Sequence, residues 1–323
     1  MRKLITFLTF CALTFCAGAQ NQNLTIRHLS DTHTMIQVNG KDRYVLLPVQ
    51  ETAQEARVKV IANGSEVLAA NVSLAIDKTD YLVPLDLGAW SGSSILLDVK
   101  MTQGRGVRRD PSDDVCWSDM TTAPVFTWTD QEKAYRPTYH FAPEYGWMND
   151  PNGMVYKDGE WHLFFQYNPY GSFWGNMTWG HAVTRDLVHW EQLDNAILPD
   201  ALGDIFSGSA VVDKENTAGF GRDAIVAMYT SAGDNQTQSL AYSNDGGRTF
   251  TKYPGNPVIM AEDTPDFRDP KVFWDDQTRQ WKVVLAAGQE VQFYSSDNLK
   301  DWKYESSFGL AYGNHNGVWS ALT

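Results

Sequence analysis

Cysteine is scarce in this chain. Three cysteines occur among 323 residues, at Cys11, Cys16 and Cys116. The first two lie in a leader-like segment at the N-terminus, and removal of that segment would leave Cys116 as the one thiol. An intrachain disulfide framework is thereby excluded, and we expect the fold to be stabilised by packing alone.

Positive charge is also in short supply. Lys and Arg total 26 against 39 Asp and Glu, which gives a formal net charge of -13. A protein that binds nucleic acid needs a basic surface to neutralise phosphates, so we expect no nucleic-acid partner. The hydrophobic content of 43% and the charged content of 20% fit a folded protein and not a disordered one.

Long apolar runs are missing outside the N-terminus. There, Arg2 and Lys3 precede a largely apolar run over 4–16, and the small residues 17–19 follow. This pattern is typical of a secretory signal peptide over 1–19, and the run is shorter than the ~20 residues that a membrane span needs. We expect no membrane span and export to the periplasm or the extracellular space. Lipid anchoring at Cys16 is the alternative, which the bulky Phe15 disfavours.

The segment that follows, residues 20–130, contains short alternating runs separated by turn sequences. Asn39-Gly40 lies between the runs 34–38 and 43–49, and Asn63-Gly64 follows a third run. Asn-Gly favours a type I′ hairpin because both residues tolerate positive φ. With further strand-like runs at 81–85 and 95–101, the pattern predicts an N-terminal β-sandwich accessory module. We find no catalytic constellation in it.

Residues 131–323 repeat themselves at intervals of about 50 to 60 residues. One repeated element centres on Asp186, Asp245 and Asp297, each with Ser or Thr two residues before it and an aromatic residue four or five after it. A carboxylate in this position closes a hairpin turn, so we expect the three aspartates to be structural. The copy at 243–250 is similar to the Asp-box of sialidases, a turn at the periphery of propeller blades.

A second repeated element precedes each of these turns. The segments 150–156, 206–212 and 268–274 all run from polar residues into a β-rich apolar stretch. Repeated β-rich units without helical periodicity predict the blades of a β-propeller. Because inner strands begin at one mouth of the central channel, this fold would bring Asp150, Ser207 and Asp269 around one pocket.

Five motifs resemble those of glycoside hydrolase family 32, the invertases, inulinases and levanases that cleave β-fructosyl linkages. In chain order they are 147–153 (WMNDPNG), 164–169 (FFQYNP), 174–181 (WGNMTWGH), 206–209 (FSGS) and 267–270 (FRDP). The resemblance implies an all-β chain whose residues 131–323 supply about three blades of a five-bladed propeller. It also implies hydrolysis of levan, inulin or sucrose with retention, without a cofactor.

The resemblance assigns a role to each candidate site residue. Asp150 would be the nucleophile, and Asp269, with Arg268 beside it, would hold the fructosyl hydroxyls and stabilise the oxocarbenium-like transition state. The remaining candidates would bind the substrate. Asn149, Gln166 and Ser207 would form hydrogen bonds to the sugar, and Trp174 and Phe206 would wall the pocket with apolar surface. We expect no metal site, because the spacing of the histidines does not fit metal ligation at His162, His181, His189 and His315.

The match to the family fails near the C-terminus. The family's acid/base glutamate belongs to a Trp-Glu-Cys-Pro-Asp motif expected at Trp319, where this sequence reads Trp-Ser-Ala-Leu-Thr. Loss of one G from codons for the family motif produces that reading, so we expect a frameshift, or a sequencing error that mimics one. The C-terminally truncated chain as given should have little or no activity on sucrose, inulin or levan. The alternatives are a non-catalytic fructan-binding remnant and an inverting arabinosidase-type glycosidase. The motifs at 147–153 and 268–270 disfavour the arabinosidase.

Overall fold

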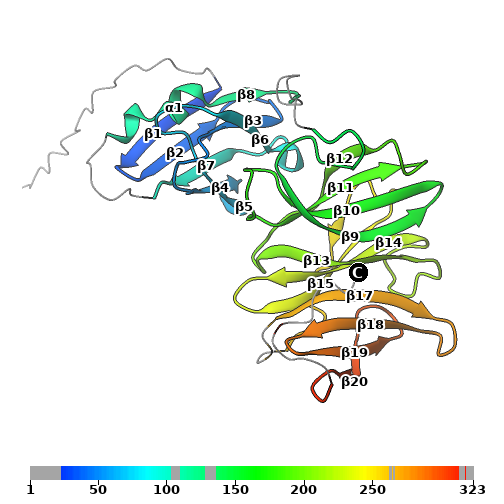
Figure 1. The fold of residues 1–323 in the computed structure, drawn as a ribbon. Coiled ribbons are helices and arrows are strands. Elements are labelled where there is room, and N and C mark those ends of the chain that lie inside the picture. Colours follow the sequence, from blue (N-terminus) through cyan, green and yellow to red (C-terminus); the bar gives the residue numbers. More distant parts are fainter. Residues whose placement is uncertain are drawn as a thin grey trace, which may run out of the picture.

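The computed structural model of the protein describes residues 23–102, 110–127, 136–261, 264, 266–312 and 317. A β-rich N-terminal unit lies beside three stacked sheets (Figure 1). The expected signal peptide, the lipidation site at Cys16, the domain boundary near Asp130, His315 and the residues from 318 onward lie outside the described residues.

Two sheets form the N-terminal unit. One has five strands in the order β1-β2-β7-β4-β5 and the other has three in the order β6-β3-β8. The strands are β1 (Leu24–Ser30), β2 (His33–Val38), β3 (Tyr44–Val49), β4 (Ala56–Ala62), β5 (Ser65–Val72), β6 (Tyr81–Asp86), β7 (Ile95–Lys100) and β8 (Thr121–Ala123). Short helices are η1 (Gly88–Trp90), η2 (Pro111–Asp113) and α1 (Val115–Asp119). Alternate residues of the strands, such as Val58 and Val60, enter one core shared by both sheets, which confirms the predicted sandwich.

The two Asn-Gly pairs have different outcomes. Asn63 and Gly64 have φ of +50° and +86° and join the antiparallel strands β4 and β5, as predicted. Asn39-Gly40 leads from β2 in the five-stranded sheet to β3 in the three-stranded sheet, so the hairpin predicted there is wrong. Since β2 and β3 bury their apolar residues in the same core from opposite layers, the chain has to cross between the layers at this point.

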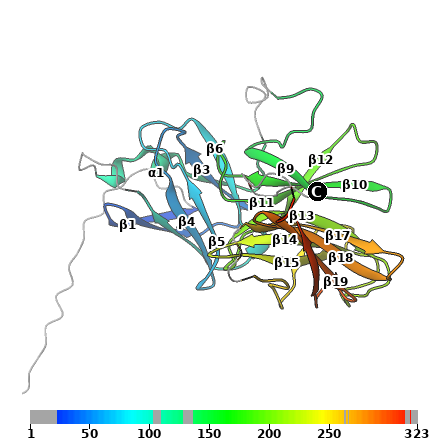
Figure 2. The ribbon, with the colours of Figure 1, turned by 60° about the horizontal axis from the view of Figure 1, so that its bottom comes forward.

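Three four-stranded antiparallel sheets follow, in the orders β12-β11-β10-β9, β13-β14-β15-β16 and β17-β18-β19-β20. Apolar clusters fill the spaces between successive sheets. The views in Figures 1 and 2 show the sheets stacked like the blades of a propeller, with β9, β13 and β17 as neighbouring first strands. These findings confirm the predicted all-β fold. The strands are β9 (Trp147–Lys157), β10 (Glu160–Asn168), β11 (Thr178–Thr184), β12 (Glu191–Ile197), β13 (Asp204–Asp213), β14 (Ala224–Ala232), β15 (Gln236–Ser243), β16 (Thr251–Lys252), β17 (Phe267–Asp275), β18 (Gln280–Ala287), β19 (Glu290–Ser296) and β20 (Lys303–Phe308).

The repeated turn joins the third and fourth strands of each blade. Asp186 Oδ1 accepts the backbone N–H groups of residues 188 and 189, and Asp245 Oδ1 accepts that of Thr249, so both aspartates are structural as predicted. The third assignment is wrong by one residue. Asn298 Oδ1 accepts the N–H groups of residues 300 and 301, while Asp297 accepts a side-chain bond from Gln280. An amide oxygen closes the turn as well as a carboxylate does.

Candidate active site

Each of the three inner strands carries an irregularity at the candidate residues. In β9, Asn149 and Asp150 together lie opposite the single residue Gln166 of β10. In β13, Ser207 is an extra residue between the paired positions 206 and 208, and in β17 Asp269 and its neighbour Pro270 lie opposite one residue of β18. A β-bulge re-aims side chains and is common beside active sites. A β-bulge therefore recurs near the start of all three inner strands.

Asp150 and Ser207 meet across two blades. Ser207 Oγ donates a hydrogen bond of 3.0 Å to Asp150 Oδ2. Ser207 is buried, whereas Asp150 is exposed at the mouth. The bond fixes the orientation of the carboxylate without removing it from solvent.

Asp269 lies at the same end of the blades. Its backbone N–H donates to Thr230 Oγ1 at 3.2 Å, and Thr230 pairs with Phe206, the neighbour of Ser207. Asp269 is 6% exposed and has φ of +60°, a left-handed conformation that costs a residue other than glycine about 1 kcal/mol or more. The fold thus holds a buried carboxylate in a strained backbone beside the Asp150–Ser207 pair.

Arg268 is shared between two carboxylates. Its Nε lies 3.9 Å from Asp269 Oδ2, at the outer limit of an ion pair, whereas Nη1 forms a closer ion pair with Asp266 Oδ1. The sequence predicts Arg268 as the partner of Asp269, and its closer ion pair with Asp266 was not predicted. The spacing Asp-x-Arg-Asp over 266–269 was the available signal.

Two buried amides of this region lack partners. The Nε2 of Gln166 and both polar side-chain atoms of Asn152 are buried without a hydrogen bond to any residue that the structure describes. An unsatisfied buried polar group costs about 1 to 3 kcal/mol, so such groups require an explanation such as a ligand or water. Gln166 was a predicted binding residue; Asn152, although within the motif at 147–153, was not. Asn149 Oδ1 accepts a hydrogen bond of 3.2 Å from the Trp147 indole.

Trp174 and Phe206, the two residues predicted to wall the site, contact each other. Their ring centroids are 6.0 Å apart at an interplanar angle of 72°, an edge-to-face contact. Phe206 belongs to β13, and Trp174 belongs to the segment between β10 and β11. Trp174 is 58% exposed, which leaves its face accessible to a ligand.

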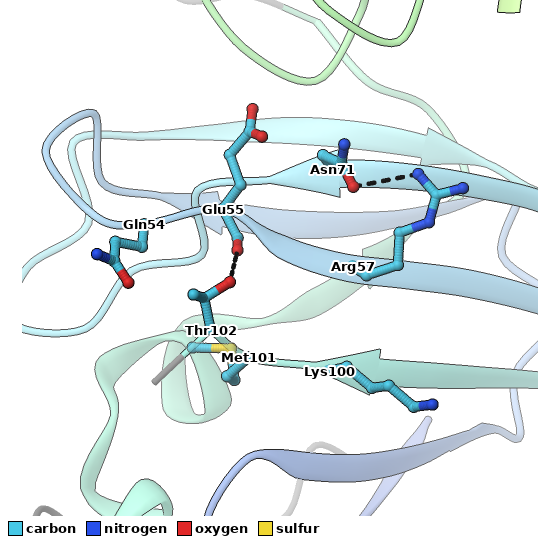
Figure 3. Close-up of a pocket in the computed structure, with 7 residues that line it drawn as sticks. All are labelled: Gln54, Glu55, Arg57, Asn71, Lys100, Met101 and Thr102. Carbon is cyan, nitrogen blue, oxygen red and sulfur yellow. Dashed lines mark hydrogen bonds between the residues drawn. The ribbon is translucent and has the colours of Figure 1, made fainter. Parts of the chain in front are cut away.

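A separate hollow of about 570 Å³ lies on the sandwich (Figure 3). Figure 3 shows the side chain of Arg57 bonded to Asn71, at 3.1 Å between Nη1 and Oδ1. The hollow contains none of the predicted site residues, and we assign it no catalytic role. Its lining residues are Gln54, Glu55, Arg57, Asn71, Lys100, Met101 and Thr102.

The described part of the chain contains neither a cluster of metal-ligating side chains nor a helix able to span a membrane. Within the described ranges, no three His, Cys, Asp or Glu side chains gather as a metal site requires. No helix in the described part of the chain is long and apolar enough to cross a membrane.

Comparison with known families divides the chain in two. Residues 140–322 match the N-terminal domain of glycosyl hydrolases family 32, and residues 30–139 match a domain of unknown function, DUF4980. All of the candidate site residues fall within the first match.

Relatives and solved structures match the same part of the chain. A levanase of Bacillus subtilis is 59% identical over 192 residues, covering 58% of this chain and 28% of the levanase. An extracellular exo-inulinase of Aspergillus awamori is 47% identical over 219 residues, covering 58% of this chain and 41% of the inulinase. The crystal structure of an exo-inulinase from that fungus superimposes with a TM-score of 0.53, at 47% identity over 57% of this chain and 42% of the inulinase. The chain therefore spans less than half the length of these relatives.

Proposed function

The chain belongs to glycosyl hydrolase family 32, and from this premise we propose that its site acts on β-fructosyl linkages, as found in levan, inulin or sucrose. The three described blades are part of the five-bladed propeller of this family. We also propose the organisation inferred from the sequence: a signal peptide over 1–19, an accessory sandwich over 20–130 and propeller from 131 onward. The protein would then be exported.

One observation carries the proposal. Three inner strands, from three blades, present Asp150, Ser207 and Asp269 at one mouth, each at a bulge. Hydrolysis with retention needs a nucleophilic carboxylate that can reach the anomeric carbon of the sugar. Asp150 fits this role because it is exposed at the mouth and is oriented by the hydroxyl of Ser207.

In the proposed first step, an Asp150 oxygen forms a bond to the anomeric carbon while the bond from that carbon to the leaving oxygen breaks. The leaving oxygen takes a proton from a general acid, the role of the glutamate in the family's Trp-Glu-Cys-Pro-Asp motif, which none of the candidate residues above fills. Water later hydrolyses the fructosyl–Asp150 ester. An activated leaving group such as fluoride departs without that proton. The nucleophilic step can therefore be tested separately from acid catalysis.

The neighbouring residues would bind the fructosyl unit. Asp269 would accept hydrogen bonds from the sugar hydroxyls and stabilise positive charge that develops in the transition state. The unpartnered Nε2 of Gln166 would donate to an oxygen of the sugar, which would satisfy its hydrogen-bonding capacity. Asn149 would add further hydrogen bonds, and the wall of Trp174 and Phe206 would pack against the ring.

Trapping of the covalent intermediate tests the proposal. The chain is mixed with β-fructofuranosyl fluoride and examined by intact-protein mass spectrometry, followed by peptide mapping. We expect one fructosyl unit on the peptide that contains Asp150 and none in Asp150→Asn. Asp158→Asn, which removes an exposed carboxylate after β9, is the matched control and should label like the unmodified chain. Labelling that persists in Asp150→Asn would refute the assignment of the nucleophile.

A further inference from the structure

The segment that carries Trp174 packs against the N-terminal sandwich. Tyr170, which directly follows β10 and Pro169, is 6% exposed and belongs to the same apolar cluster as sandwich residues such as Val49 and Leu74. Burial raises the pKa of the Tyr170 phenol, as expected for a ring enclosed in a core. A residue of the propeller therefore completes the core of the accessory sandwich.

Asn176 makes a second connection, by hydrogen bonds. Its Oδ1 accepts the backbone N–H of Asn71 at 2.8 Å, and its Nδ2 donates to the backbone carbonyl of Asn71 at 2.9 Å. Asn71 lies in β5, an edge strand of the five-stranded sheet. The amide of Asn176 therefore pairs with the free edge of the sandwich as a neighbouring strand would. Asn176 is 8% exposed and has φ of +47°, so both its side chain and its backbone are confined.

The same amide is connected to the segment that leads to Trp174. Asn176 Nδ2 also donates to Asn168 Oδ1 at 3.1 Å, and Asn168 Nδ2 donates to the carbonyl of Phe173 at 2.9 Å. The Asn168 oxygen accepts the N–H of Tyr170 as well, at 3.0 Å. A continuous series of hydrogen bonds thus runs from the edge of the sandwich to the residue that precedes Trp174.

We propose that the N-terminal sandwich positions Trp174 against Phe206, with Asn176 as the positioning residue and Tyr170 as the anchor. The sandwich then helps to build the wall of the substrate site. Trp174 is exposed and borders Phe206 through one edge contact, so its orientation depends on the backbone that carries it. This inference depends on the proposed function in one respect, which is that a fructosyl group is the ligand that contacts Trp174 and Phe206.

A substitution of Asn176 tests the positioning without any ligand. The chain is labelled with 5-fluorotryptophan, and Trp174→Phe identifies the ¹⁹F resonance of residue 174. In Asn176→Ala we expect this resonance to move toward its position in the unfolded chain. Asn176→Gly, which also removes the amide but tolerates the φ of +47°, should move the resonance in the same direction and guards against misfolding of the alanine variant.

Asn256 supplies the matched control. Its side chain makes the same pair of bonds to the backbone of Leu240, at 2.8 and 2.9 Å, within the second blade. Asn256→Ala should leave the resonance of residue 174 in place. The inference is overturned if Asn176→Ala leaves that resonance unchanged in a folded chain, or if Asn256→Ala shifts it equally.

Binding of D-fructose, measured by calorimetry, adds the functional readout. We expect the affinity for fructose to fall about 5- to 30-fold in Asn176→Ala, which corresponds to a loss of about 1 to 2 kcal/mol in binding free energy. In Asn256→Ala the affinity should stay within about twofold of the unmodified chain. Absence of fructose binding in the unmodified chain would count against the proposed function, while the ¹⁹F result would still decide the positioning. Equal affinities of the unmodified chain and Asn176→Ala would overturn the role of positioning in binding.

Discussion

Acid should destabilise the protein through a pair of buried histidines. His162 Nδ1 and His181 Nε2 are 3.0 Å apart, and each residue is 1% exposed. Phe164 stacks on His181 with ring centroids 4.3 Å apart, and Phe250 of the next blade meets His181 edge-on. The pair therefore lies between two blades in surroundings that cannot solvate a charge.

The structure gives the direction and the size of the effect. Burial, with a smaller contribution from His162, lowers the pKa of His181 to about 3, and burial also lowers the pKa of His162. In the unfolded chain a histidine titrates near 6.5, so below that pH the unfolded state binds more protons than the folded state. The contribution to stability is fully present above pH ~6.5 and is lost as pH falls toward the folded pKa. His181 then removes about 1.4 kcal/mol of unfolding free energy per pH unit, and His162 acts in the same direction.

Urea unfolding at pH 7.5 and pH 5.0 measures this loss. We expect His181 to account for about 2 kcal/mol between these values, since about 1.5 pH units lie below 6.5. His181→Gln should be less stable at pH 7.5 but should lose about 2 kcal/mol less on acidification. His140→Gln removes an exposed histidine and should match the unmodified chain. An unfolding free energy that does not fall between the two pH values, or an equal fall in His181→Gln, would refute the reasoning.

Three further outcomes follow from the packing. Gly208→Ala should lower the unfolding free energy by about 1 to 3 kcal/mol, because a Cβ there would lie 2.1 Å from the Met228 carbonyl oxygen; an unchanged melting temperature would contradict this. Gly64→Ala meets no atom within 4 Å, so its cost in urea unfolding should be only the ~1 to 2 kcal/mol of a left-handed alanine, and a larger loss would disprove the exposed turn. Cys116 is fully buried, so in the chain from residue 20 onward, where it is the one thiol, Ellman's reagent should modify it only after unfolding, and rapid reaction of the native form would show that its surroundings are wrong.

The Asn-Gly dipeptides show most clearly how far structure can be predicted from this sequence, because the same dipeptide had two outcomes. Asn63-Gly64 and Asn39-Gly40 are the same dipeptide between strands, yet only the first closes a hairpin. Local φ preferences determine which residues can turn, whereas pairing of the flanking strands depends on long-range packing. The third blade turn illustrates a smaller error, since Asn298 can replace aspartate in a turn that needs only an acceptor oxygen.

Part of the candidate site was predictable from the sequence because its residues lie in repeated segments of the chain. The polar starts of three similar strands indicated that Asp150, Ser207 and Asp269 would share one end of the blades. The bonds from Ser207 to Asp150 and from Asp269 to Thr230 agree with that arrangement, and the catalytic roles stay predictions. The bonds of Asn176 to Asn71 were not predictable, because they join residues 105 positions apart through a strand edge that only the folded sheet defines. The burial of Tyr170 in the sandwich depends on that docking and was missed for the same reason.

A crystal structure of Asp150→Asn with a bound β-fructoside tests the central claim most directly. The account predicts a fructosyl ring at the mouth, with its anomeric carbon next to residue 150, hydroxyls on Asp269 and a bond from Gln166. The side-chain amide of residue 150 and the carboxylate of Asp269 should lie within the ~9.5 Å that spans one sugar in glycosidases. A fructosyl unit bound instead in the sandwich hollow of Figure 3, or side chains of residues 150 and 269 too far apart to share one sugar, would contradict the account.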